Sequence, residues 1–260
     1  MTTFGISMVK NEGDIIEDVI NHTLTQVDHI IVADNLSTDN TREILSGFGD
    51  RITLVDDKEV GYYQSKKMTA LAHKANQAGA DWVIPFDADE IWFSPSFDTI
   101  SAHLASIPDE FVCVVAEWYH HAVTVLDDPD EDNVFKRMRF RLTKPSHMRK
   151  VAARCNEKLV IEQGNHGIQY GGVFWTSNTL LEARHFPYRT LEQFMSKVVN
   201  GNNAYVAAPD LPAQMGTHWK EQGSAIEKSG IDKAKELFNN TIIYDMSGMV
   251  EDPVPIRGLN

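Results

Sequence analysis

The sequence predicts an α/β protein built on a Rossmann-like, mainly parallel sheet flanked by helices, and three observations indicate this class. Over the first ninety residues, short apolar runs alternate with segments whose apolar residues recur at helical spacing. The run at residues 28–34 is continuous rather than alternating, which is typical of a strand covered on both faces. Beyond residue 91 the links become shorter and less regular. A mixed-strand half is therefore expected after the parallel βαβ units.

Four strands and three helices are expected in the first half. The strands are the apolar runs at residues 3–9, 28–34, 51–57 and 81–89. A helix over 11–26 rests on five apolar residues that fall on one helical face. The next helix, from residue 41, is expected to end at Gly47 or Gly49, and the long helix from residue 61 at Gly79.

The second half is expected to continue the same domain, because no repeat or low-complexity linker interrupts residues 1–260. Its composition and spacing predict three helices and four strands around an acidic turn. The helices are expected over residues 96–107, 190–208 and 225–240, the strands over 111–123, 135–142, 158–163 and 172–186, and the turn over 126–133.

Composition excludes several functional classes. The chain has 260 residues and a formal net charge of -13, which argues against nucleic-acid binding because such a surface needs clustered Lys and Arg. No signal peptide is visible, and no apolar run approaches the ~20 residues of a membrane helix. Cys113 and Cys155 lack metal or redox spacing and are expected to be buried free thiols. We therefore expect a cytoplasmic protein without a membrane span.

Polar clusters follow all four expected strands of the first half. They are Lys-Asn-Glu at residues 10–12, the segment 34–39, the Asp pair at 56–57, and Asp-Ala-Asp-Glu at 87–90. A single polar strand end is ordinary loop chemistry. Because ligands of open α/β sheets bind at the carboxyl ends of the strands, four clusters in series favour a binding site.

The sharpest cluster is Asp87, Asp89 and Glu90, which follow the apolar run "WVIPF". Alternation puts Asp87 and Asp89 on one side of an extended segment, where their carboxylates can converge. Such a pair suits a hard divalent cation, Mn²⁺ or Mg²⁺, that also takes phosphate oxygens. The alternative is helix capping by Asp89 or Glu90, or by the serines that follow.

The first third of the chain resembles a family 2 glycosyltransferase with the GT-A fold. "VADNLSTDNT" is similar to the "V-D-D-x-S-x-D-x-T" segment of that family, and "FDADE" to its Asp-x-Asp motif. The resemblance covers residues 4–93, with Asn35 in place of the second Asp of the first motif. It implies a single GT-A domain, with a nucleotide-sugar-binding half over 1–93, an acceptor and catalytic half over 94–220, and a C-terminal helical extension over 221–260.

The resemblance implies a nucleoside-diphosphate-sugar donor in the first half. The backbone at Met8 and Val9 would line the base pocket, and Glu12 would hold a ribose hydroxyl. Asp34 and Asp57 would meet the base or ribose, and Lys66 or Lys67 would reach the diphosphate. Asp34 is equally suited to an Asx-turn, and the lysines to a solvated surface.

The resemblance also implies a cation, either Mn²⁺ or Mg²⁺, that bridges Asp89 to the diphosphate, with Asp87 as a further ligand or a ribose contact. A His from the second half completes the metal shell in some GT-A enzymes, and His185 is placed plausibly for this. His166 is a weaker candidate, and both can instead be structural histidines. Arg184 and Arg189 either assist the diphosphate or pair with acids.

An inverting transfer needs a general base for the acceptor hydroxyl, and family 2 members use a carboxylate from the second half. Glu117 is our choice for this catalytic role, alongside Asp89 at the metal, because aromatic residues flank Glu117 and burial would raise its pKa. The alternatives are the carboxylates of the acidic turn, which is more often a solvated loop: Asp127, Asp128, Asp130, Glu131 and Asp132.

We therefore expect a metal-dependent glycosyltransferase that moves a sugar from a nucleoside-diphosphate donor to a carbohydrate or other hydroxyl acceptor. One alternative is a nucleotidyltransferase, although the N-terminal segment lacks the Gly-rich phosphate loop of that class. Another is a non-catalytic carbohydrate-binding module, against which the intact Asp-Ala-Asp-Glu segment argues.

Overall fold

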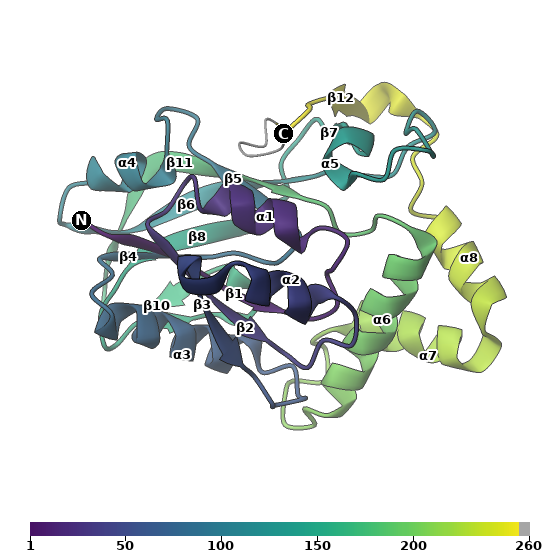
Figure 1. Cartoon of the computed structure of the whole chain (residues 1–260), viewed down its shortest axis with the longest axis horizontal. Helices are drawn as coiled ribbons and strands as arrows, with labels where there is room; N and C mark the ends of the chain where they lie inside the picture. Colours follow the sequence, from purple (N-terminus) through teal and green to yellow (C-terminus); the bar gives the residue numbers. More distant parts are fainter. Residues whose placement is uncertain (255–260) are drawn as a thin grey trace.

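The first four strands of the computed structural model, which describes residues 1–254, lie parallel at one side of the main sheet. They are β1 (Thr3–Val9), β2 (His29–Asp34), β3 (Ile52–Asp56) and β4 (Trp82–Pro85), in the spatial order β3-β2-β1-β4 (Figure 1). Each was expected from its apolar run. The carboxyl ends of these strands lie at one edge of the sheet, because parallel strands share a direction.

Four further strands complete an eight-stranded mixed sheet. They follow β4 in the order β8 (Arg149–Arg154), β6 (Phe111–His120), β11 (Trp175–His185) and β5 (Glu90–Phe93). β8 is antiparallel to both β4 and β6, β11 is parallel to β6, and β5 is antiparallel to β11. The predicted α/β class, with a parallel first half and a mixed second half, is confirmed.

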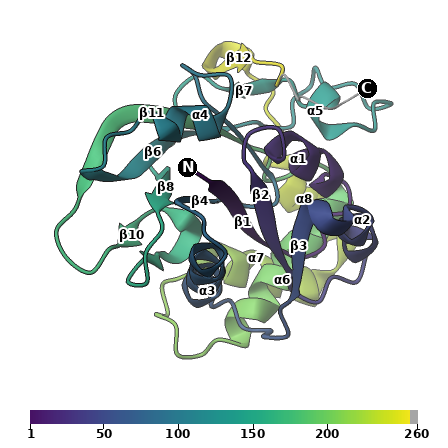
Figure 2. The same ribbon diagram turned by 60° about the vertical axis from the view of Figure 1, so that its left-hand side comes forward.

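Helices cover both faces of the parallel strands (Figure 2). Alternate residues of β2 enter two separate cores, which shows that the faces are distinct. Ile30 and Val32 pack with α1 (Ile16–Thr23), α2 (Thr41–Gly47) and α4 (Ile100–Ala105). Ile31 and Ala33 pack with α3 (Gln64–Gln77). As predicted for the long helix, a glycine follows its end, and Gly79 has a φ of +88°.

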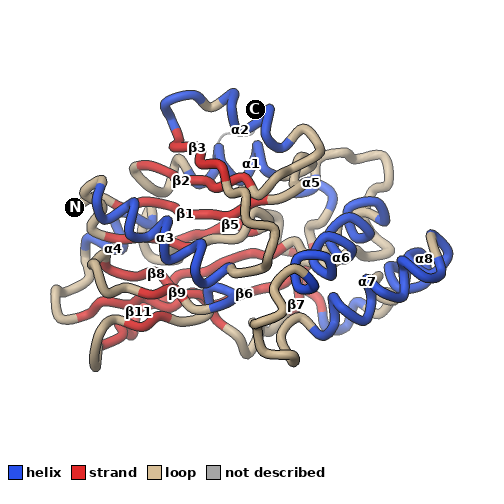
Figure 3. Tube along the Cα trace, turned by 90° about the horizontal axis from the view of Figure 1, so that it is seen from below, coloured by secondary structure: helices blue, strands red, loops and turns tan. Residues whose placement is uncertain are grey.

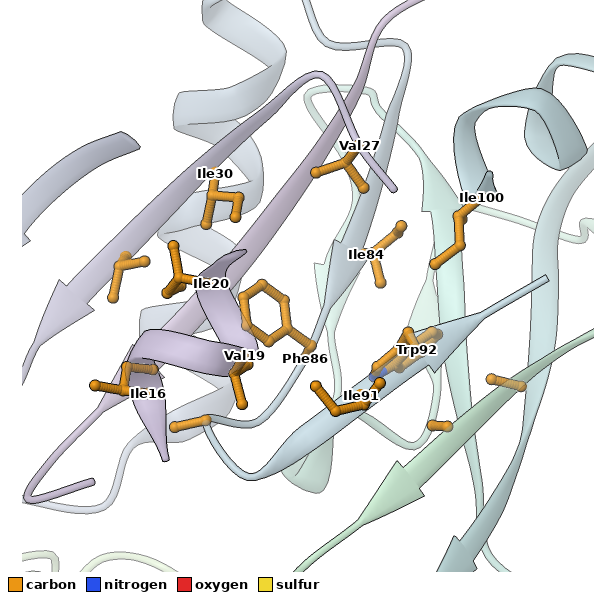
Figure 4. Packing of buried hydrophobic residues seen from close by; sticks show 14 of the residues in the cluster. Ile16, Val19, Ile20, Val27, Ile30, Ile84, Phe86, Ile91, Trp92 and Ile100 are labelled. Carbon is orange, nitrogen blue, oxygen red and sulfur yellow. The ribbon is translucent and has the colours of Figure 1, made fainter. Parts of the chain in front are cut away.

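The larger core lies under α1 and α4 (Figure 4). Phe86 and Trp92 flank the Asp-Ala-Asp-Glu segment, and their side chains are 1% and 2% exposed. Burying an aromatic or aliphatic side chain of this size contributes about 1.5–3 kcal/mol. The acidic segment is therefore held by apolar anchors on either side.

Three helices pack beside the carboxyl edge of the parallel strands (Figure 3). They are α6 (Leu191–Val206), α7 (Thr217–Ser229) and α8 (Ile231–Asn239), and they share a small core around Phe194 and Ile226. The single helix expected over 225–240 is two helices, because Gly230 adopts a φ of +72° between them. The last six residues of the predicted extension over 221–260 lie outside the described residues.

Shorter elements depart further from the sequence expectations. The strand expected over 135–142 begins instead as α5 (Val134–Arg137), because the Asn133 side chain accepts hydrogen bonds from two backbone amides and caps a helix. Only β7 (Phe140–Leu142) remains of that strand, paired with β12 (Met249–Glu251). β9 (Val160–Ile161) pairs with β10 (Ile168–Gln169). The strands β5 and β8 were not predicted.

The structure contains two free cysteines among its described residues, Cys113 in the core and Cys155 half-buried. Burial raises the pKa of the Cys113 thiol to about 11, so it stays protonated at neutral pH. Over residues 1–254, every helix is too short or too polar to cross a bilayer.

Candidate active site

A cavity of about 620 Å³ lies at the carboxyl edge of the parallel strands, between the strand ends and the helices α6 and α7. Residues at or just after the carboxyl ends of β1, β2 and β4 line it, including Val9, Glu12, Asn35, Asp87 and Asp89. Three of the four predicted strand-end clusters therefore meet at one cavity. Its size is in the range of cofactor and substrate sites.

Asp87 lies at the cavity in a dense set of protein donors. Its carboxylate accepts hydrogen bonds from Lys150 Nζ at 2.5 Å, Asn165 Nδ2 at 2.9 Å and Gln64 Nε2 at 3.1 Å. Lys150 also pairs with the fully buried Glu90 at 2.9 Å. Burial opposes the charge of Lys150, but the two carboxylates outweigh it and raise its pKa.

Asp89 faces a different set of cationic groups. Lys197 of α6 donates to its Oδ2 atom, His185 Nε2 lies 3.4 Å away, and an Arg189 nitrogen lies 3.9 Å away. Burial works to raise the pKa of Asp89, but the Lys197 ammonium and His185 outweigh it and hold the pKa well below its usual range. Asp89 is therefore a carboxylate at neutral pH.

His185 is fixed by its neighbours at the end of β11. Its ring stacks on Trp118 with centroids 4.7 Å apart, and its Nδ1 atom lies 2.9 Å from Nδ1 of His120. Burial and the neighbouring His185 lower the pKa of His120 to about 4. His120 is therefore neutral at pH 7. The contact between the two Nδ1 atoms helps to orient the His185 ring, whose Nε2 atom lies 3.4 Å from Asp89 Oδ2.

Arg189 links the first polar cluster to the rest of the site. It is 2% exposed and donates to Glu12 at 2.5 Å and to Asp14 at 2.7 and 2.8 Å. A guanidinium in this fork geometry holds carboxylates in fixed positions. Of the two roles considered for Arg189, the structure shows the pairing with acids.

Aromatic side chains from α6, from α7 and from the segments before α3 and α6 form one wall of the cavity. The Tyr62 ring lies 4.8 Å from that of Tyr205 and 5.4 Å from that of Trp219, measured between centroids. All three line the cavity, together with Tyr188 and His218. Flat apolar faces with polar edges suit a ring-shaped ligand such as a sugar or a base.

The sequence model of "Glycosyl transferase family 2" matches residues 6–168, more than half of the chain. The protein belongs to glycosyl transferase family 2. It is therefore a glycosyltransferase, which decides against the nucleotidyltransferase and the non-catalytic module as alternatives. A search of curated proteins finds no match.

Solved structures resemble the chain at low sequence identity. S. aureus TarS 1-349 is 12% identical with a TM-score of 0.41, over 93% of this chain and 83% of that chain. Glucosyl-3-phosphoglycerate synthase from Mycobacterium tuberculosis, in complex with Mg²⁺ and uridine-diphosphate, is 20% identical with a TM-score of 0.30, over 46% of this chain and 43% of that chain.

Three residues that were predicted to bind the donor do not line the cavity: Asp34, Asp57 and Lys67. Asp34 is 7% exposed, accepts a hydrogen bond from the Ser37 amide at 3.3 Å and lies 3.6 Å from Arg42. Asp57 and Lys67 pair with each other at 2.7 Å. Asn35, which replaces the second Asp of the family motif, lines the cavity and donates to Asp57 at 2.9 Å.

The structure does not bring Glu117 to the cavity of the glycosyltransferase. Glu117 and Trp118 are neighbours on β6, so their side chains point to opposite faces of the sheet, and Trp118 lines the cavity. Glu117 accepts a hydrogen bond from Tyr119 at 2.8 Å. Arg184 pairs with Glu182 and Asp252 away from the cavity. The carboxylates of residues 127–132 also lie outside it.

Of the three predicted metal ligands, Asp89 and His185 lie close together in the structure. Asp87 instead accepts hydrogen bonds from Lys150, Asn165 and Gln64. Within residues 1–254, no three His, Cys, Asp or Glu side chains form a cluster that could hold a metal ion by themselves. A cation at this site would therefore need ligands from the substrate. The cavity is suited to that, because its other lining groups include the cations Lys10, Lys150 and Lys197.

Two lysines that no sequence pattern indicates neutralise the carboxylates of the Asp-x-Asp motif. Lys150 lies on β8, which lacks a clear apolar pattern, and Lys197 lies in a helix where it reads as an ordinary surface residue. Only their spatial neighbours, 63 and 108 positions away, identify them as site residues.

Proposed function

We propose that the protein transfers a sugar from a nucleoside-diphosphate donor to a hydroxyl acceptor inside this cavity, with a divalent cation held by Asp89 and His185. The observation that carries the proposal is the approach of Asp89 Oδ2 to His185 Nε2, at 3.4 Å, on the wall of a cavity large enough for both substrates. Family membership supplies the class of reaction.

The donor set at Asp89 and His185 fits Mn²⁺ or Mg²⁺. One carboxylate and one imidazole, completed by oxygens of the diphosphate, are ligands that these cations accept. The Lys197 ammonium on Asp89 already occupies the position that a cation would take. When bound, the cation would neutralise charge on the departing nucleoside diphosphate as a Lewis acid.

The chain itself supplies further groups for the donor. Val9, Lys10 and Asn35 line the cavity, and we assign Val9 and Asn35 to the base and ribose and Lys10 to the diphosphate. Burial and the neighbouring Lys67 lower the pKa of Lys10, and an anionic ligand beside Lys10 would favour its charged form. Asp87, held by Lys150, is oriented for a ribose hydroxyl rather than for the metal.

The pairing of the cavity carboxylates with cations favours an inverting transfer by single displacement. A retaining double displacement needs a free carboxylate nucleophile beside the sugar. Among the described residues, three carboxylates line the cavity, and each has a cationic partner: Glu12 with Arg189, Asp87 with Lys150, and Asp89 with Lys197.

Calorimetry with a panel of nucleoside diphosphates, with and without Mn²⁺, tests this proposal. We expect one nucleotide to bind more tightly with Mn²⁺, and Asp89→Ala to remove that gain. Asp109→Ala is the matched control, because the Asp109 side chain is fully exposed and far from the cavity lining. The absence of metal-dependent nucleotide binding in the wild type would refute the metal-bound donor. Release of nucleoside diphosphate from a panel of nucleotide sugars then identifies the donor.

A further inference from the structure

His166 presents an unprotonated ring nitrogen to the cavity. Its Nδ1 atom lies 2.7 Å from the backbone carbonyl of Arg149. A carbonyl oxygen only accepts, so Nδ1 carries the proton and donates it, and Nε2 of the neutral ring keeps its lone pair. Because Nδ1 is taken up by the backbone and the residue lines the cavity, Nε2 is the atom available to a ligand.

The segment around His166 is rigidly held. Gly164 and Asn165 both have left-handed backbone, with φ of +76° and +59°. The Gly164 amide donates to Gln64 at 2.8 Å, and its carbonyl accepts from Lys150 at 3.0 Å. Asn165 donates to Asp87. The same groups that orient Asp87 therefore set the position of the His166 ring.

The close packing of Gly164 against His166 also fixes the orientation of the His166 ring. A Cβ atom on residue 164 would lie 2.4 Å from His166 Cδ2 and 2.8 Å from its Nε2 atom. Only glycine leaves room for the ring in this orientation. On its other side the ring meets the Trp118 edge, with centroids 5.3 Å apart.

Among the described residues that line the cavity, no carboxylate is free to act as the general base for the acceptor hydroxyl. The three that line it are each held by a cation, and Glu117 points to the other face of the sheet. The Lys197 ammonium and His185 hold the pKa of Asp89 well below its usual range, so Asp89 is a weak base. Burial raises the pKa of Glu12, but its carboxylate accepts a hydrogen bond from the buried Arg189 guanidinium at 2.5 Å.

The surroundings of His166 keep its ring neutral. Burial and the nearby Lys150 ammonium lower its pKa, against opposing effects of the Arg149 carbonyl and Asp87, while His185 adds to the lowering. At pH 7 the ring is therefore neutral.

We propose that His166 is the catalytic base that accepts the proton of the acceptor hydroxyl, the role that the sequence assigned to Glu117. This inference rests on the proposed function. As the acceptor oxygen forms its bond to the anomeric carbon, its proton passes to Nε2 of His166. The bond from the anomeric carbon to the diphosphate oxygen breaks, and its electron pair leaves with the nucleoside diphosphate. The resulting imidazolium returns its proton to solvent.

The first test is chemical rescue of His166→Ala. With the donor identified by nucleotide-sugar turnover, we expect the variant to lower kcat by about 10²–10⁴-fold, with nucleoside diphosphate affinity unchanged in calorimetry. Added imidazole should restore part of the rate, which a merely structural role would not allow. His147→Ala is the matched control, because His147 is exposed and does not line the cavity.

Three outcomes would overturn the assignment. One is a His166→Ala rate within a few-fold of wild type, and another is a reduced rate that imidazole does not restore. The third is a loss with imidazole rescue in His218→Ala instead, since His218 also lines the cavity. A wild-type protein that turns over no nucleotide sugar would refute the proposed function itself, and this inference with it.

The tautomer of His166 provides a test that needs no substrate. In protein labelled with ¹⁵N-histidine, NMR correlations of the ring nitrogens should show His166 protonated on Nδ1 and unprotonated on Nε2 at pH 7, with assignment by the His166→Ala variant. A proton on Nε2 at that pH would overturn the proposal even if the enzyme is active.

Discussion

Lys150 and Glu90 form an ion pair inside the protein, with Nζ 2.9 Å from Oε1 and with side chains 1% and 0% exposed. Lys150 also holds Asp87, so one buried ammonium neutralises two of the three carboxylates of the Asp-Ala-Asp-Glu segment. Unpaired carboxylates resist burial. The segment can therefore follow an apolar strand only because β8 brings this lysine against it.

We expect Lys150→Met to reduce the free energy of unfolding by about 3–5 kcal/mol, because it leaves the buried Glu90 without a counter-charge. Urea denaturation measures this change. Lys150→Met with Glu90→Gln should recover part of the loss, since the amide carries no charge. Lys144→Met, at an exposed position, should stay within about 0.5 kcal/mol of wild type. A Lys150→Met protein as stable as this control would contradict the role assigned to the pair.

Lys197→Met should strengthen binding of Mn²⁺ in the presence of the nucleoside diphosphate. Lys197 donates to Asp89, so it competes with a cation for the same carboxylate. A charged hydrogen bond contributes roughly 1.5 kcal/mol or more, which corresponds to about a tenfold gain in affinity once the competitor is gone. Calorimetric titration with Mn²⁺ measures it. Affinity that is equal in both proteins would show that the cation does not use Asp89.

The sequence predicts the first half of the fold well because its signals are local. Continuous apolar runs and helical spacing are visible within each segment, and the strand-end rule then locates the cavity. β5 and β8 were missed for a physical reason. β5 pairs with residues 182–185 of β11, and β8 lies between β4 and β6, so distant partners rather than their own pattern make them strands.

The sequence also predicts some residues of the candidate site and fails for others. Asp87, Asp89 and His185 reach the cavity as predicted from their strand ends. Glu117 does not, because side chains alternate across a strand and a shift of one residue exchanges the two faces. The apolar run that contains Glu117 gives no alternation from which its face could be read.

Gly164→Ala should displace the ring of His166. Residue 164 has a φ of +76°, which costs an alanine about 1–2 kcal/mol, and the added Cβ would press on the His166 ring. We expect a lower kcat. The control is Gly172→Ala, where a Cβ meets nothing within 4 Å. If Gly164→Ala turned over donor as fast as this control, the position of His166 would not matter for the reaction.

His103 should make the protein less stable as the pH falls. It is buried, with ring nitrogens 2.9 Å from Ser94 Oγ and 3.0 Å from Thr179 Oγ1. Burial lowers the pKa of His103, so the folded protein keeps it neutral while the unfolded chain protonates near its ordinary pKa of about 6.5. Below that value the unfolded state binds the extra proton, and stability falls by at most about 1.4 kcal/mol per pH unit.

The loss should continue down to the lowered pKa of the folded protein and then level off. In His103→Gln the amide can keep a hydrogen bond to either hydroxyl but does not titrate. Urea denaturation at several pH values between about 7.5 and 5 should therefore show a shallower decline for this variant than for the wild type. Parallel curves for the two proteins would mean that His103 is protonated equally in the folded and unfolded states.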